Sequence, residues 1–181
     1  MTIRLAHLSD IHFGGENAAA VAGATEHIAT GDFDLVVVSG DLTRYAEKAE
    51  FQAAAAWLAS LPSDRLVTPG NHDAPYLAWA ERIFAPFRRF EAAIGPARSQ
   101  THLGGGFAVR GVNTARGAQP RINWSKGQIS RNQTDEAADW FETAAPECFR
   151  IVVCHHPLIE MLGGPMTARV WGGPAAAQAF S

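Results

Sequence analysis

Short apolar runs alternate with longer segments whose apolar residues recur at helical spacing along most of the chain. A short run without helical spacing is typical of a strand, and apolar residues three or four apart are typical of an amphipathic helix. Strands are predicted at residues 3–8, 35–38, 66–68, 107–112 and 150–154. Helices are predicted at residues 17–30, 46–60, 77–90 and 134–144, and another alanine-rich helix opens after residues 172–174.

The central run of the pattern, Leu35-Val36-Val37-Val38, is apolar at every position. A strand of that kind is buried on both faces, as in a parallel sheet covered by helices. Pro86 is expected to break or kink the helix at residues 77–90, and Thr134 is expected to cap the later helix. Strands that alternate with helices predict an α/β fold, and we expect one domain over residues 1–181.

Composition places the chain among globular proteins. Hydrophobic residues make up 47% and charged residues 18%, with a net charge of −3, which argues against a broad basic surface for nucleic acid. The two cysteines, Cys148 and Cys154, suggest neither a disulfide framework nor a zinc site of the Cys-x-x-Cys type. No signal-peptide core and no run of membrane-spanning length is present, so we expect a cytoplasmic protein without a membrane partner.

Polar clusters rich in histidine and aspartate follow four of the predicted strands. In open α/β sheets the carboxyl ends of the strands are where sites assemble, so these clusters are expected to converge. Aspartate and histidine together suit Mn, Fe or Zn better than Ca or Mg, and two such ions can clamp a phosphate. Taken singly, each cluster also fits a turn or a helix cap, and their combination in order favours a metal site. The clusters are Asp10-Ile11-His12, Gly40-Asp41, Gly70-Asn71-His72-Asp73 and His155-His156.

This ordered set of motifs resembles the calcineurin-like metallophosphoesterases. Residues 8–12, 39–43 and 155–158, together with the stretch from Gly127 to Trp140, are most similar to the bacterial class III cyclic-nucleotide phosphodiesterases. The resemblance implies an αββα sandwich with two transition-metal ions. It also implies that a hydroxide bridging the metals attacks a small phosphodiester, such as a cyclic nucleotide, or a phosphomonoester.

The resemblance also implies a role for each residue of the motifs. Asp10 and His12 would hold the first metal, Asp41 would bridge, Asn71 and His155 would hold the second, and His72, oriented by Asp73, would donate a proton or stabilise the transition state. Asn71, His72 and Arg116 would contact the substrate, although Arg116 also fits an exposed loop cation. The choice of His155 over His156 rests on the resemblance, since alternation along a strand says only that the two point in opposite directions.

The family closes its site with a late Gly-His-x-His motif, and no histidine follows His156 here. We therefore expect a domain that is incomplete at its C-terminal end. Without that motif each metal would lose a ligand, which predicts weak or single-metal occupancy. A catalytically impaired binding or regulatory module, a nuclease and a phosphomonoesterase are the alternatives, and the oligomeric state is left open.

Overall fold

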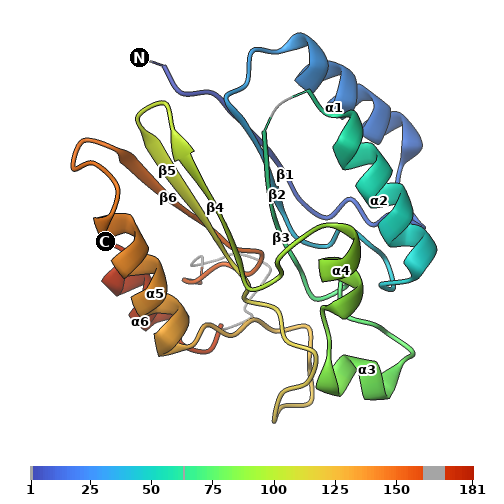
Figure 1. Ribbon diagram of the computed structural model, residues 1–181. Coiled ribbons are helices and arrows are strands. Elements are labelled where there is room, and N and C mark those ends of the chain that lie inside the picture. The colour runs from blue at the N-terminus through green and yellow to red at the C-terminus, as the bar shows by residue number, and fades with distance from the viewer. Residues whose placement is uncertain (1, 63, 161–169) are drawn as a thin grey trace.

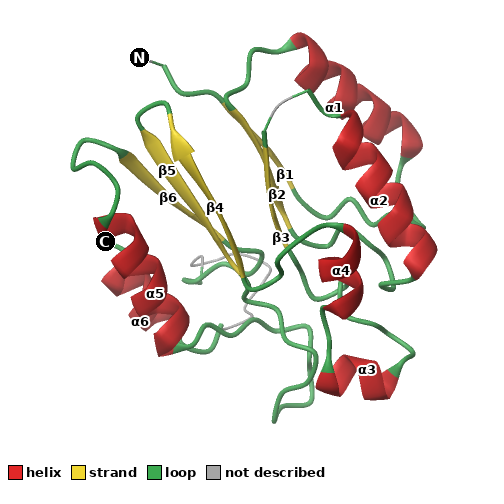
Figure 2. Cartoon of the chain, in the orientation of Figure 1, coloured by secondary structure: helices red, strands yellow, loops and turns green. Residues whose placement is uncertain are grey.

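Two three-stranded sheets face each other, and helices cover the outer face of each (Figures 1 and 2). The structure, a computed structural model, describes residues 2–62, 64–160 and 170–181. Helices α1 (Ala18–Thr30), α2 (Lys48–Ser60) and α4 (Arg88–Ala93) lie outside the first sheet, and α5 (Arg131–Glu142) and α6 (Gly173–Ala179) lie outside the second. This arrangement confirms the predicted αββα sandwich.

The first sheet is wholly parallel, with β2 between its neighbours. It consists of β1 (Leu5–Leu8), β2 (Leu35–Ser39) and β3 (Arg65–Thr68), connected through α1 (Ala18–Thr30) and α2 (Lys48–Ser60). Leu35 and Val37 pack between the sheets, whereas Val36 and Val38 pack towards the helices. Burial of β2 on both faces is thereby confirmed.

The second sheet pairs an antiparallel hairpin with one parallel strand. It consists of β4 (Ser99–Gly104), β5 (Phe107–Val112) and β6 (Phe149–Val153). The sequence did not predict β4, because this edge strand reads Ser-Gln-Thr-His and pairs on one side only. Gly105 and Gly106, with φ of 56° and 80°, form the tight turn between β4 and β5.

The helices differ from prediction at two places. The helix predicted at 77–90 is two helices, α3 (Trp79–Phe84) and α4 (Arg88–Ala93), and the break at Pro86 is confirmed. The prediction that Thr134 caps the later helix is wrong, because α5 (Arg131–Glu142) is capped by Ser130. The Ser130 side chain accepts from the backbone N–H of Gln133, and the Gln133 side chain accepts from the backbone N–H of Ser130, which forms a capping box.

The last helix, α6 (Gly173–Ala179), opens where the sequence predicts it. The glycine- and proline-rich stretch at residues 163–169 lies outside the described residues. Within the described part of the chain, no helix has both the length and the apolar character needed to cross a bilayer.

Candidate metal centre

Loops that leave β1, β2, β3 and β6 meet at one edge of the sandwich. Asp10 and His12 follow β1, and Asp41 follows β2. One ligand atom from each of these three lies within 4.8 Å of the others. His155, which follows β6 in the other sheet, joins the same group through Asp41. The structure therefore brings together four residues that the sequence analysis assigns to the metals.

Asp41 lies at the middle of this group and is 3% exposed. Its Oδ2 is 3.4 Å from His155 Nε2 and 3.8 Å from His12 Nε2. Its Oδ1 accepts the backbone N–H of His72 at 2.8 Å. Asp10 is more exposed, and its Oδ1 lies 3.8 Å from His12 Nε2. One carboxylate thus faces both imidazoles, the position that a bridging ligand requires.

Backbone carbonyls at the end of β2 and in the loop after it fix the orientation of three histidine rings. A carbonyl only accepts hydrogen bonds, so each Nδ1 in contact with one must carry the proton. In the neutral form of such a ring Nε2 is the unprotonated nitrogen, which is the one that can bind a metal. The Nδ1–carbonyl pairs are His12 with Thr43 at 3.2 Å, His155 with Ser39 at 2.8 Å and His72 with Arg44 at 2.7 Å.

The electron-rich atoms in this group need a cation among them. Two unprotonated nitrogens and a carboxylate oxygen repel at 3.4–3.8 Å unless a positive charge lies between them. In the metal-free protein a proton can take that place. Burial by itself lowers the pKa of His155, but the hydrogen bond and charge of Asp41 outweigh burial and raise it to about 9. The residues therefore fit a transition metal, which prefers mixed nitrogen and oxygen ligands.

The pKa of Asp41 moves in the complementary direction. Burial by itself would raise the pKa of this carboxyl group, but the hydrogen bond and charge of His155 hold the pKa below its ordinary value. The backbone N–H of His72 contributes in the same direction. Asp41 is therefore ionised and available as a ligand.

Three of the candidate ligand residues sit in strained backbone conformations. Asp10, His12 and Asp41 have φ of 57°, 54° and 53°, in the left-handed region. That conformation costs a residue with a side chain about 1–2 kcal/mol. Such strain persists where the surroundings impose it, and it concentrates at functional sites.

Two glycines allow the loops to approach this closely. A Cβ on Gly40, whose φ is 94°, would lie 2.7 Å from His155 Nδ1. A Cβ on Gly70 would lie 2.1 Å from Asp41 Oδ1. Asn71 therefore stands between Gly70, packed on Asp41, and His72, bonded to Asp41. The glycines of Gly-Asp and Gly-Asn-His-Asp are thus explained by close packing around the Asp41 carboxylate.

Asp73 connects two of the loops and is fully buried. Its carboxylate accepts the N–H of Gly70 at 2.8 Å and both the N–H and the hydroxyl of Thr43 at 2.9 Å. Burial outweighs these bonds and raises the pKa of Asp73 to about 6. The sequence analysis assigns Asp73 to orient His72, but the ring of His72 is held by the Arg44 carbonyl. Asp73 instead ties the loop that contains His72 to the loop after β2, through its bonds with Gly70 and Thr43.

The adjacent histidines point in different directions, with ring planes 84° apart. His156 is buried, and its two ring nitrogens contact the Thr114 hydroxyl at 2.9 Å and the Ser125 carbonyl at 2.8 Å. Burial, with the charge of His155, lowers the pKa of His156 to about 4. Of the pair, His155 is the one that reaches Asp41, and His156 braces the loops of the second sheet.

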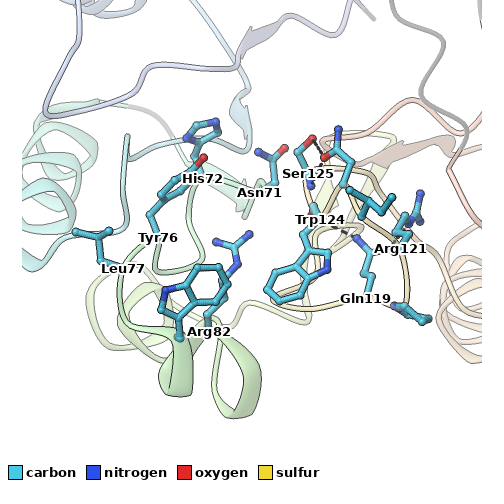
Figure 3. Close-up of a pocket in the computed structure, with 13 residues that line it drawn as sticks. Asn71, His72, Tyr76, Leu77, Arg82, Gln119, Arg121, Trp124 and Ser125 are labelled. Atoms are coloured by element: carbon cyan, nitrogen blue, oxygen red, sulfur yellow. Dashed lines mark hydrogen bonds between the residues drawn. The ribbon is translucent and has the colours of Figure 1, made fainter.

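A pocket of about 1080 Å³ opens beside Asn71 and His72 (Figure 3). Tyr76, Trp79 and Trp124 form aromatic walls. Sequence reasoning did not single out Tyr76 or Trp79, because one exposed aromatic residue in a loop or helix carries no specific signal. Only their shared position beside Asn71 makes them candidates for substrate contact.

The structure does not bring Arg116 to this pocket. Its guanidinium donates to the backbone carbonyls of Asn113 and Ala115 at 3.0 and 2.7 Å and to the Gln133 side chain. Half-buried, it ties the loop after β5 to the start of α5. Arg82, which sequence reasoning passed over, lines the pocket in its place.

Comparisons with known proteins agree with this geometry. The family model described as calcineurin-like phosphoesterase matches residues 3–180. Among solved structures, the chain is similar to a dimetal phosphatase from Danio rerio, with a TM-score of 0.69 and 10% sequence identity. That match covers 98% of this chain and 77% of the other, and at such identity it shows the fold alone. A comparison with curated proteins gave no match.

Proposed function

Because the chain belongs to the calcineurin-like phosphoesterase family, we propose that it is a dinuclear metallophosphodiesterase. Asp10, His12, Asp41, Asn71 and His155 would hold the metals, which we infer to be Mn, Fe or Zn. The observation that carries the proposal is the Asp41 carboxylate facing the Nε2 atoms of two histidines, His12 and His155, that follow strands of opposite sheets. That arrangement supports the proposal because it gathers nitrogen and oxygen donors around one point, as a transition-metal site requires.

Bound metals would supply Lewis acidity, activating water and neutralising the phosphate oxygens. The chain's own contribution is to hold groups in place around the phosphate. His72 is set edge-on to His12, with ring centroids 4.8 Å apart, and its Nδ1 is fixed by the Arg44 carbonyl. Its Nε2 is thus the atom that would carry a proton to the leaving oxygen, or stabilise charge on the phosphoryl oxygens.

A diester substrate fits the surroundings of the centre. The pocket beside Asn71 and His72 has room for a substituent on the ester oxygen that is not cleaved. The similarity of residues 8–12, 39–43 and 155–158 to the class III phosphodiesterases supports the same choice. We therefore infer a phosphodiester, with cyclic nucleotides among the candidates.

Replacing the bridging carboxylate by its amide tests the proposal. Asp41→Asn keeps the shape of the side chain but removes its charge, so hydrolysis of bis(4-nitrophenyl) phosphate with Mn²⁺ should fall by at least about a hundredfold. Asn71→Ala should have a similar effect. Asp139→Asn, the same change at an exposed position on α5, should leave the rate unaltered. Undiminished turnover in Asp41→Asn would contradict the proposal.

Substrate comparisons separate the alternatives. Faster release of nitrophenol from 4-nitrophenyl phosphate than from the diester would indicate a phosphomonoesterase. Cleavage of short oligonucleotides in preference to small diesters would indicate a nuclease. Metal binding without turnover of any phosphoester would indicate a binding or regulatory module.

A further inference from the structure

A buried arginine from α3 reaches the pocket beside the metal centre. Arg82 is 7% exposed. Its Nε donates to the Gly117 carbonyl at 2.8 Å, and its Nη1 donates to the carbonyls of Ala74 and Pro75 at 3.0 and 3.1 Å. Three of its donor contacts thus join the two loops that wall the pocket.

The charge of Arg82 is not balanced by an acid within the described residues. No carboxylate there lies within 4.0 Å of its guanidinium. Its carbon Cζ lies instead 5.9 Å from the ring centroids of both Tyr76 and Trp124. Burial lowers the pKa of Arg82, yet an arginine in a protein keeps its proton. A buried cation without an anion is costly, which calls for an explanation.

The outer nitrogen of Arg82 faces the pocket. Nη2 has no hydrogen-bond partner among the described residues. It is also absent from the polar atoms there that are both unpaired and fully buried, so it is accessible from outside. Arg82 lines the same pocket as Asn71 and His72. Figure 3 shows its guanidinium between Tyr76 and Trp124, pointing towards the side where Asn71 lies. Two N–H groups are therefore available to a ligand in the pocket.

We propose that Arg82 selects phosphoesters that carry a second anionic group on the substituent that is not cleaved. A carboxylate or a further phosphate would accept from Nη2, and a flat apolar part of the same substituent would pack against Trp79 and Trp124. This inference rests on the proposed function, since it assigns the part of the substrate that lies beyond Asn71. It concerns specificity, because Arg82 would bind the part of the substrate away from the reacting phosphorus.

A purely structural role accounts for only part of the observations. If Arg82 only linked the two loops, that role would explain the hydrogen bonds of Nε and Nη1. It would not explain why Nη2 faces the pocket or why the guanidinium has no acidic partner among the described residues. Loss of this link between the loops would also lower the turnover of charged and uncharged substrates by the same factor. The ratio between a charged and an uncharged substrate is therefore the measurement that separates the two roles.

The experiment uses phosphodiesters of 4-nitrophenol that differ in one group of the second ester. The second aryl group carries a carboxylate, a phosphonate or the uncharged carboxamide, at either the 3 or the 4 position. A hydrogen bond to a charged group is worth about ten- to a hundredfold in an equilibrium constant. For the unmodified protein with Mn²⁺, we expect kcat/KM for the better anionic ester to exceed that for the amide about tenfold. The two anionic arms tell a carboxylate ligand from a phosphate ligand.

Substitution assigns the preference to Arg82. In Arg82→Met the ratio should fall to about one, and Arg82→Lys should retain part of it. Arg131→Met removes the same charge from a side chain that is 92% exposed, and it should keep the full ratio. If circular dichroism shows that Arg82→Met does not fold, the ratios measured for the unmodified protein and for Arg82→Lys decide between the two roles.

Binding measurements keep this inference distinct from the proposed function. The corresponding uncleavable phosphonates are titrated while the intrinsic tryptophan fluorescence, to which Trp79 and Trp124 contribute, is followed. Tighter binding of the anionic analogues, together with no hydrolysis of the matching phosphodiesters, would support the role of Arg82 and count against the proposed function. Equal kcat/KM and equal affinity for the charged and uncharged compounds at both positions, or a preference that survives in Arg82→Met, would overturn the inference.

Discussion

At the scale of single residues, the site is organised by one loop. The carbonyls of Ser39, the last residue of β2, and of Thr43 and Arg44, in the loop after it, fix three imidazole rings. Asp41 in that loop faces two of them. A carbonyl that holds Nδ1 decides which nitrogen is left for a metal. The exit of β2 therefore supplies both the central carboxylate and the orientation of its neighbours.

The adjacent histidines should respond differently to substitution. His155→Ala removes a nitrogen that faces Asp41, so affinity for Mn²⁺ should fall at least about tenfold, as measured by calorimetric titration. His156→Ala leaves that group intact but removes contacts with Thr114 and Ser125. Its free energy of unfolding in urea should fall by about 2–4 kcal/mol, with Mn²⁺ affinity nearly unchanged. The reverse pattern would assign the ligand to His156.

At the scale of elements, parallel strands bring the loops together, and close packing sets how near they come. Strands β1, β2 and β3 end at the same edge because they run in the same direction. The left-handed turns at Asp10, His12 and Asp41 then direct the side chains inward. Helices farther from the site carry no such constraint, so a glycine there has a different meaning from a glycine beside Asp41.

A pair of glycine substitutions tests this difference. Gly23 lies on an exposed face of α1, where an added Cβ meets nothing within 4 Å. Gly23→Ala should therefore raise the free energy of unfolding by about 0.5–1 kcal/mol through helix propensity. Gly70→Ala would press a Cβ onto Asp41 Oδ1. It should lower stability and weaken Mn²⁺ binding; thermal unfolding and metal titration of both variants give the comparison, and a stabilised Gly70→Ala would refute the packing argument.

At the scale of the whole molecule, the candidate metal centre lies where the two sheets meet. Asp10, His12 and Asp41 follow strands of the first sheet, and His155 follows a strand of the second. A cation bound by all of them would link the sheets in addition to the apolar layer between them, where Leu35 and Val37 pack on residues of the second sheet. Metal binding should therefore be coupled to the stability of the entire domain.

Thermal unfolding measures that coupling. A ligand at a hundred times its Kd adds about 2.7 kcal/mol, which for a domain of this size corresponds to about 5–10 °C in Tm. Saturating Mn²⁺ should produce such an increase, and a chelator should reverse it. Asp41→Asn should show little increase. A Tm that is indifferent to Mn²⁺ in the unmodified protein would show that the group does not bind metal in the folded state.

Local patterns in the sequence determined most of the framework. The apolar run at 35–38 predicted a strand buried on both faces, Pro86 predicted the helix break, and the order of the motifs predicted a family that the comparison confirmed. These features depend on periodicity and on the backbone preferences of neighbouring residues, which a sequence displays directly. The edge strand β4 was not predicted, because its polar residues lack that periodicity.

The tertiary structure decided which side chains meet. His155 contacts a carbonyl 116 positions away in the chain and reaches Asp41, whereas the ring of His156 contacts Thr114 and Ser125. Arg116 was a candidate from its loop, but its neighbours hold it away from the pocket, while Arg82 reaches the pocket from a helix without a motif. Ring orientation, burial and an unpaired charge arise from contacts between distant segments. Those contacts exist only once the two sheets have packed together, so spacing along the chain could not reveal them.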